Sequence, residues 1–196
     1  MKNHGNYIVS LGNVCKWLSE VAEGLGVEIY PGFSAAEVLF NEDNSVKGVA
    51  TGDMGVSKEG SAKESWEAGM ELHAKYTLFS EGTRGSLSKF LINNFNLSED
   101  KDFQKYAIGL KEVWEIKEEN FSEGLVEHSL GWPLSDGTNG GSFLYHFDKN
   151  LVSVGYVIHL NYTNPYASPF DEFQQFKTHP SIKKILKGGK LSLIHI

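Results

Sequence analysis

Cysteine is almost absent from this sequence of 196 residues, with Cys15 as the single example. One cysteine cannot build an internal disulfide framework, and it cannot supply the several thiolates that a zinc site or an iron–sulfur cluster requires. Cys15 lies within an amphipathic pattern, so we expect it to pack as a small apolar residue rather than to act as a reactive thiol.

Long apolar runs and an excess of basic charge are also missing. No stretch of about 18 apolar residues occurs, so no segment has the character of a membrane-spanning helix, while contact with one membrane surface stays open. The sequence has 18 Lys and Arg against 25 Asp and Glu, a net charge of −7. Nucleic acids require a basic face, and this balance argues against them as partners.

The G-x-G-x-x-G fingerprint, whose backbone amides cradle the pyrophosphate of FAD or NAD, is absent as well. Gly24-Leu25-Gly26 comes nearest, but Ile29 stands where the third glycine belongs. The histidines show no metal-ligand spacing. Those in strand patterns, which we interpret as structural, are His128, His146 and His159.

The first part of the chain mixes helix and strand signals. Residues 10–25 have apolar side chains at three- and four-residue spacing, which predicts an amphipathic helix that Gly26 ends in a left-handed conformation. A short strand is expected at 27–30 directly after it. A helix followed at once by a strand is typical of an α/β unit.

A hairpin is predicted next, with strands at 35–40 and 46–51, because the residues between them are typical of turns. Residues 52–69 are polar and contain glycine, which indicates a surface excursion. A strand is expected over 71–79, with residues 76–79 as its buried end. A helix with an apolar side should follow.

From residue 96 the composition changes. Four strand candidates are rich in β-branched and aromatic residues, and they are 106–116, 125–130, 142–147 and 151–160. They predict an antiparallel sheet whose last two strands form a hairpin through 148–150. Short helices are expected at 170–176 and, capped by Ser181, at 182–186. Residues 191–196 show no structural context, and we interpret them as a non-native tail.

The first candidate binding motif is Glu81-Gly82, which stands between an expected strand and an expected helix. Glycine lets a backbone approach a ligand closely, and a helix N-terminus offers unpaired amides to a phosphate. Strand, Glu-Gly and helix in this order are typical of FAD-binding two-domain oxidoreductases. An ordinary strand-to-helix turn has the same pattern.

The second candidate motif is Gly140-Gly141, just before an aromatic strand. Adjacent glycines leave a length of backbone that a flat ring or a carbonyl group can reach. A simple β-turn would use the same residues. No local signature marks a nucleophile or an acid–base pair, so the catalytic residues are left unassigned.

Several runs of residues, taken together, resemble the family of electron transfer flavoprotein–ubiquinone oxidoreductases, and the resemblance covers about residues 3–190. The runs are His4 to Val9, Gly26 to Gly32, Glu71 to Lys75, Val126 to His128, Gly131 to Leu134, Gly140 to His146, Asn164 to Tyr166 and His179 to Lys183.

The resemblance implies an internal fragment of a membrane-associated flavoenzyme with a mixed α/β (α+β) fold. Residues 1–105 would be the later part of an FAD-binding domain, in a two-domain FAD-binding oxidoreductase fold. Residues 106–190 would be part of a ubiquinone-binding domain. Electrons would pass from reduced electron transfer flavoprotein through FAD and a 4Fe-4S cluster to ubiquinone. The cluster ligands would lie outside this segment.

The resemblance also implies positions and a location. Glu81 and Gly82 fall where the family contacts FAD, and Gly140 and Gly141 fall where it contacts the quinone head group. The enzyme would sit on the mitochondrial inner membrane, facing the matrix, or on a bacterial inner membrane. Two alternatives stay open: another flavoprotein of the same fold, such as a hydroxylase or prenyl reductase, and a quinone- or lipid-binding module without redox activity.

Overall fold

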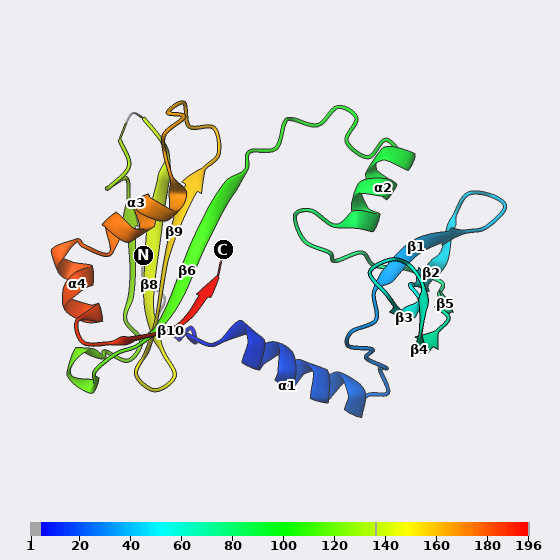
Figure 1. Ribbon diagram of the computed structural model, residues 1–196, viewed down its shortest axis with the longest axis horizontal. Coiled ribbons are helices and arrows are strands. Elements are labelled where there is room, and N and C mark those ends of the chain that lie inside the picture. Colours follow the sequence, from blue (N-terminus) through cyan, green and yellow to red (C-terminus); the bar gives the residue numbers. More distant parts are fainter. Residues whose placement is uncertain (1–4, 136, 196) are drawn as a thin grey trace. The chain divides into compact units, whose positions relative to one another are not determined.

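The computed structural model describes residues 5–135 and 137–195, which form two compact units. One unit is built from residues 26–102, and the other combines the residues up to 25 with those from 103 onward. Both contain antiparallel sheets, and helices accompany them (Figure 1). The predicted mixture of α and β structure is therefore confirmed.

The unit of residues 26–102 is organised around the predicted hairpin. Strands β1 (Ala35–Phe40) and β2 (Val46–Thr51) pair as expected, and β5 (Glu71–His73) joins the other edge of β2. Helix α2 (Ser86–Asn94) packs on this sheet because its apolar side chains recur on one face. The buried members of this small core are Val38, Leu87 and Leu91.

Two strand predictions for this unit are wrong. Residues 27–30 form no strand, because no other described segment pairs with their backbone. The strand expected over 71–79 ends at His73, and Tyr76 and Leu78 are 89% and 91% exposed. The surface excursion of residues 52–69 also contains a hairpin that the sequence pattern did not reveal, formed by β3 (Met54–Val56) and β4 (Ala62–Glu67).

The other unit contains a five-stranded antiparallel sheet in the order β10-β6-β9-β8-β7. Its strands are β6 (Ala107–Glu115), β7 (Val126–Leu130), β8 (Gly140–Phe147), β9 (Leu151–His159) and β10 (Lys190–His195). The predicted β8–β9 hairpin is confirmed, and Asp148 and Asn150 take positive φ in its turn. A short 3-10 turn, Glu118–Asn120, follows β6.

Helices α3 (Pro169–Phe176) and α4 (Pro180–Leu186) cover one face of this sheet (Figure 1). Alternate residues of β9 point to that face, because successive side chains of a strand lie on opposite sides. The main core residues there are Val152, Val154, Tyr156, Ile158, Phe173, Phe176, Ile182 and Leu186. Both predicted helices are confirmed, but the N-cap of α4 is His179 and not Ser181.

The expectation that residues 191–196 lack structural context is wrong for residues 191–195, and Ile196 lies outside the described residues. Lys190–His195 form β10, which pairs antiparallel with the outer edge of β6. Gly188, with a φ of 74°, lets the chain reverse between α4 and this strand. The physical reason is that β6 would otherwise present unpaired backbone groups along one edge, and β10 satisfies them.

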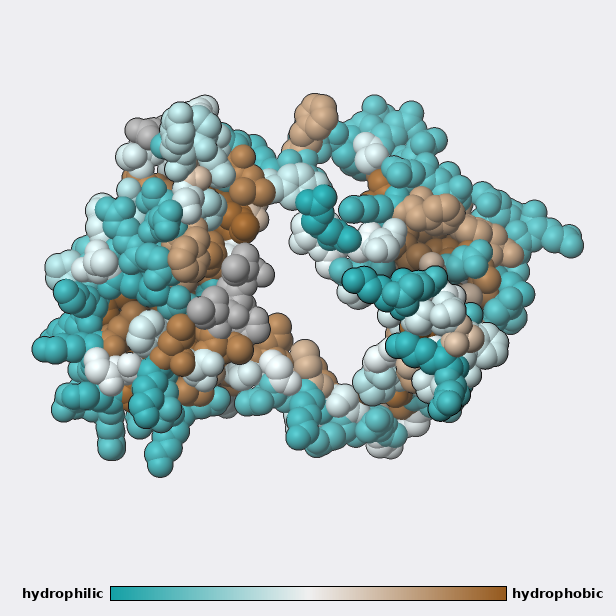
Figure 2. Space-filling model, in the orientation of Figure 1, coloured by the Kyte–Doolittle hydropathy of each residue, from teal (hydrophilic) through white to brown (hydrophobic). Residues whose placement is uncertain are grey.

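Helix α1 (Leu11–Gly24) is confirmed, and Gly26 follows it with the expected positive φ of 85°. Its apolar stripe, however, is not buried: Leu11 and Leu18 are 74% and 49% exposed, and the helix has no buried residue. Cys15 is also exposed, which corrects the expectation that it packs as a small apolar residue. A stripe is buried only when another surface covers it, and no described residue of this chain does so. Figure 2 shows brown, hydrophobic side chains on the molecular surface.

Candidate functional site

A pocket with a volume of about 760 Å³ lies beside Gly140 and Gly141. It opens on the face of the five-stranded sheet that is opposite α3 and α4. Strand register explains this, because Gly141 lies between Leu130 of β7 and Val157 of β9, and all three lie off the core face. A pocket of this size is large enough for a drug-sized ligand.

The hollow exists because glycine flanks Val157 on both sides. In the sheet, Val157 is paired with Gly141 of β8 and with Gly109 of β6. Neither neighbour has a side chain to fill the space above the sheet. The sequence therefore leaves an opening with Val157 as its floor.

Close packing also requires glycine at positions 140 and 141. A Cβ at Gly140 would overlap the carbonyl oxygen of Val157 and the side chain of Leu134, and one at Gly141 would overlap the carbonyl oxygen of Ser129. The neighbouring strands thus approach too closely for any other residue. The same closeness exposes backbone at the edge of the pocket, so the structural and the binding roles of these glycines coincide.

The turn that follows β7 is held from beneath by Tyr156. The hydroxyl of this fully buried tyrosine donates a hydrogen bond of 2.7 Å to the carbonyl oxygen of Gly131. Burial raises the pKa of Tyr156 to about 12, so the hydroxyl stays protonated and remains a donor at physiological pH. The amide of Gly131 in turn donates to the carbonyl oxygen of Gly140, at 3.1 Å. Tyr156 therefore anchors the turn to the glycine pair.

Polar and aromatic side chains complete the pocket wall. His128, Asn139 and His159 supply hydrogen-bonding groups, and Phe143 supplies an aromatic ring. Phe143 stacks on Tyr145 with 5.7 Å between ring centroids, and Gly155 beneath it leaves room for the ring. Such a site can hold a flat, largely apolar ligand with a few hydrogen-bond acceptors or donors.

Sequence reasoning found the glycine pair but not its neighbours. His128 and His159 were interpreted as structural, yet both line the pocket. Side chains alternate between the two faces of a sheet, so residues that pair with the odd-numbered residues of β8 lie on the same face as Gly141. This alternation could have identified both histidines as pocket residues. His146, in contrast, is buried at 1% exposure, and its Nδ1 accepts a hydrogen bond from the amide of Ser122.

The other predicted motif, Glu81-Gly82, lies in the unit of residues 26–102, before α2. The Glu81 carboxylate accepts hydrogen bonds from the amides of Leu87 and Ser88, at 3.2 and 2.6 Å, and from the Ser88 hydroxyl. The hydrogen bonds from Ser88 lower the pKa of this carboxyl group below its usual range. Glu81 thus satisfies the first amides of α2. The helix is where it was expected, but the preceding strand is not.

Comparison with known proteins identifies the family of this chain. A sequence profile described as "ETF-QO, ubiquinone-binding" matches residues 106–194, which include the whole pocket. The electron transfer flavoprotein-ubiquinone oxidoreductase of Pseudomonas aeruginosa is 56% identical over 191 residues, or 97% of this chain. The mitochondrial proteins of that name from Mus musculus and Homo sapiens are 56% and 55% identical over 192 residues, again 97% of this chain.

The chain belongs to the electron transfer flavoprotein–ubiquinone oxidoreductase family. It spans 35% of the length of the Pseudomonas aeruginosa relative and 31% of the Mus musculus and Homo sapiens relatives. Family members thus occur in bacteria and in mitochondria.

Two properties of the described residues bear on cofactor and membrane binding in this family. No described helix is long and apolar enough to cross a membrane. Within residues 5–135 and 137–195, no group of three or more His, Cys, Asp or Glu side chains is arranged to hold a metal ion.

The family profile also extends over most of β10, so that strand is part of the matched region.

Proposed function

We propose that this chain is the quinone-binding segment of an electron transfer flavoprotein–ubiquinone oxidoreductase, and that the pocket beside Gly140 and Gly141 binds the ubiquinone head group. The observation that carries the proposal is that Gly140 and Gly141 line this pocket together with an aromatic ring, within the region matched by the ubiquinone-binding profile. Phe143 and Val157 offer apolar contact to the ring. The backbone at the glycine pair offers hydrogen bonds to a quinone oxygen.

The pocket also contains groups that suit the reduction of a quinone, which takes up two electrons and two protons. His128 and His159 are the ionisable side chains of its wall. Because they stand beside the space for the ring, these imidazoles are the candidates for delivering protons to the reduced quinone. Tyr156 keeps the turn at Gly131 in place and has no contact with the ligand in this proposal.

In the whole enzyme, electrons would come from reduced electron transfer flavoprotein through FAD and a 4Fe-4S cluster. The enzyme would lie on the inner membrane, on the matrix side in mitochondria. Residues 1–105 would be the later part of an FAD-binding domain. Residues 106–190, together with β10, would form the ubiquinone-binding domain. Cys15 is the only cysteine, so these residues cannot supply a four-cysteine cluster site.

The geometry at Glu81-Gly82 limits how this segment can contact FAD. A phosphate does not fit at the N-terminus of α2, because the Glu81 carboxylate already occupies the Leu87 and Ser88 amides. Gly82 has a φ of 78° and an open space where a Cβ would be. We therefore propose that the exposed backbone of Gly82, and not the Glu81 carboxylate, approaches the cofactor. FAD would supply the two-electron to one-electron conversion.

The test uses the full-length enzyme and fills the hollow from its floor. Val157→Phe should obstruct the pocket and raise the KM for a short-chain ubiquinone, while reduction of the enzyme by electron transfer flavoprotein stays at the wild-type rate. Val113→Phe is the matched control, since Val113 is half-buried on the same face but does not line the pocket. Wild-type quinone kinetics in a folded, FAD-loaded Val157→Phe enzyme would contradict the proposal.

A further inference from the structure

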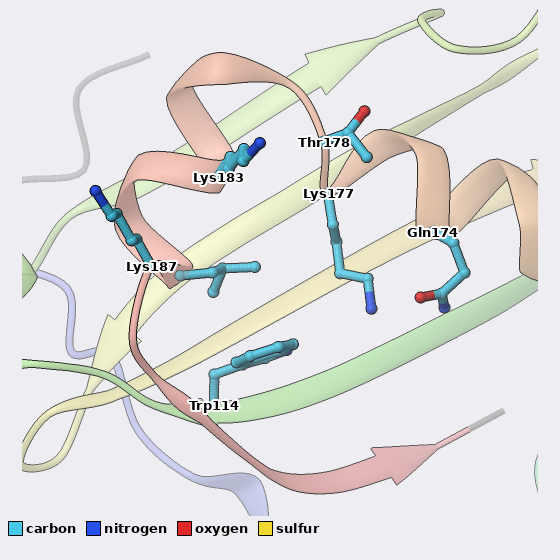
Figure 3. A pocket seen from close by; sticks show the side chains of 7 residues that line it. Trp114, Gln174, Lys177, Thr178, Lys183 and Lys187 are labelled. Atoms are coloured by element: carbon cyan, nitrogen blue, oxygen red, sulfur yellow. The ribbon is translucent and has the colours of Figure 1, made fainter.

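A second pocket, of about 320 Å³, lies on the opposite, helix-covered side of the sheet (Figure 3). Trp114 of β6 forms one wall, and residues from the end of α3 and from α4 form the others. Trp114 pairs with Val152, a core residue, whereas the quinone pocket opens on the other face. The second pocket is thus separate from the proposed quinone site, and its size is at the lower end of the range for small-molecule sites.

The base of this pocket is held by a buried ion pair. Lys177 Nζ donates to both carboxylate oxygens of Glu112, at 2.7 and 2.8 Å, and the Glu112 side chain is only 2% exposed. The indole Nε1 of Trp114 donates to the same carboxylate at 2.7 Å. Lys177 also lies 5.6 Å from the centroid of the Trp114 ring. The indole plane is therefore fixed in position before any ligand arrives.

The rim carries positive charge that the base does not neutralise. Lys183 of α4 and Lys187, which directly follows the last residue of α4, both line the pocket. In Figure 3 the Lys183 side chain extends from α4 toward α3, where Gln174 adds an amide. Among the described residues, no carboxylate lies within ion-pair distance of either lysine. This cationic rim stands out on a chain whose net charge is −7.

We propose that this pocket binds an organic phosphate ester. The phosphate would lie at Lys183, with Lys187 and Gln174 as further donors, and the apolar group of the ester would lie against Trp114 and Leu186. A phosphate fits better than a carboxylate, because its larger charge and additional oxygens match several donors. The ester can come from a phospholipid head group or from a soluble metabolite, since both present the same chemistry.

The first experiment measures binding of phenyl phosphate to the full 196-residue chain through the NMR signal of the Trp114 indole N–H. Lys183→Gln should weaken binding roughly tenfold by removing a charge-assisted contact, and Lys183→Arg should restore most of it. Lys184→Gln is the matched control, because Lys184 is adjacent on α4 but does not line the pocket. Phenol and inorganic phosphate should each bind more weakly than the ester, and salt should weaken the ester.

The second experiment separates the two sources of the ester with vesicles of phosphatidic acid in phosphatidylcholine. Cosedimentation that Lys183→Gln reduces and Lys184→Gln preserves identifies a lipid head group. Phenyl phosphate binding without cosedimentation identifies a soluble ester. The proposal is overturned if neither probe binds, if inorganic phosphate binds as tightly as phenyl phosphate, or if the two glutamine variants lose binding equally.

Discussion

The Glu112–Lys177 ion pair offers the sharpest test of how the quinone-binding unit is stabilised. The Glu112 side chain is 2% exposed and the Lys177 side chain 14% exposed, so both charges are largely removed from water. Lys177→Met keeps an apolar side chain at this position but removes the ammonium group, whose nitrogen lies 4.9 Å from the centroid of the Phe173 ring. The variant therefore leaves a buried carboxylate without its counter-charge.

The expected cost follows from this geometry. Removal of one partner of a buried ion pair costs about 3–5 kcal/mol. The Trp114 indole still donates to Glu112, so we expect the lower end, about 3 kcal/mol. Replacing both charges, as Glu112→Leu with Lys177→Met, should cost only about 1 kcal/mol, because the remaining loss is the acceptor of the Trp114 N–H.

The assay is urea unfolding of the wild-type chain, both single variants and the double variant, followed by the Trp114 indole NMR signal. In Lys177→Met the buried carboxylate has lost its cation, whereas the double variant contains neither charge. The single variant should therefore be the less stable of the two by about 2 kcal/mol. Equal stability of the Lys177→Met and double variants would refute this reasoning.

Three further predictions concern single features. Burial lowers the pKa of His146, so as the pH falls the unfolded state takes up the proton before the folded state does. The free energy of unfolding should therefore decrease below a pH of about 6.5. A His146→Phe variant should lack this dependence in urea titrations at several pH values. Deletion of residues 191–196 should lower the free energy of unfolding by about 2 kcal/mol, because it removes two half-exposed leucines of β10 from the sheet. Thermal or urea unfolding measures this loss, and an unchanged stability would show that β10 is dispensable. Tyr156→Phe should cost about 1 kcal/mol and raise the KM for quinone more than it lowers the rate of enzyme reduction; a purely structural role would change both alike.

Several elements that the sequence predicts correctly have partners that lie close to them along the chain or in the adjacent sheet. In the β1–β2 and β8–β9 hairpins, one short segment contains both paired strands and a turn with Asn or Asp at positive φ. Short-range chemistry is sufficient there. The apolar periodicity of α3 likewise finds its surface in the adjacent sheet.

Three of the failures have a common physical cause, because pairing and burial there depend on distant partners. Residues 27–30 have the composition of a strand but no described neighbour, while Lys190–His195 have no turn or cap yet find the free edge of β6. Cys15 has the right spacing for burial but no covering surface. Local pattern does not decide such cases.

The candidate site was predictable in part for a similar reason. Gly140 and Gly141 are adjacent in sequence before an aromatic strand, which marks them as a candidate motif, and the family resemblance adds the quinone role. Gly109, Val157 and the pocket histidines come from other strands, and only the sheet register brings them beside the glycine pair. The hollow is a property of three neighbouring strands, which no local motif encodes.

Photoaffinity labelling of the full-length enzyme with an azido-ubiquinone tests the central claim most directly. Peptide mapping of the labelled protein should place the modification on the pocket strands, within residues 128–143 or 157–159, and excess unlabelled ubiquinone should suppress it. Val157→Phe should reduce the labelling, and Val113→Phe should not. Labelling that ubiquinone suppresses but that maps to α3 and α4, or outside this segment altogether, would contradict the assignment of the quinone site.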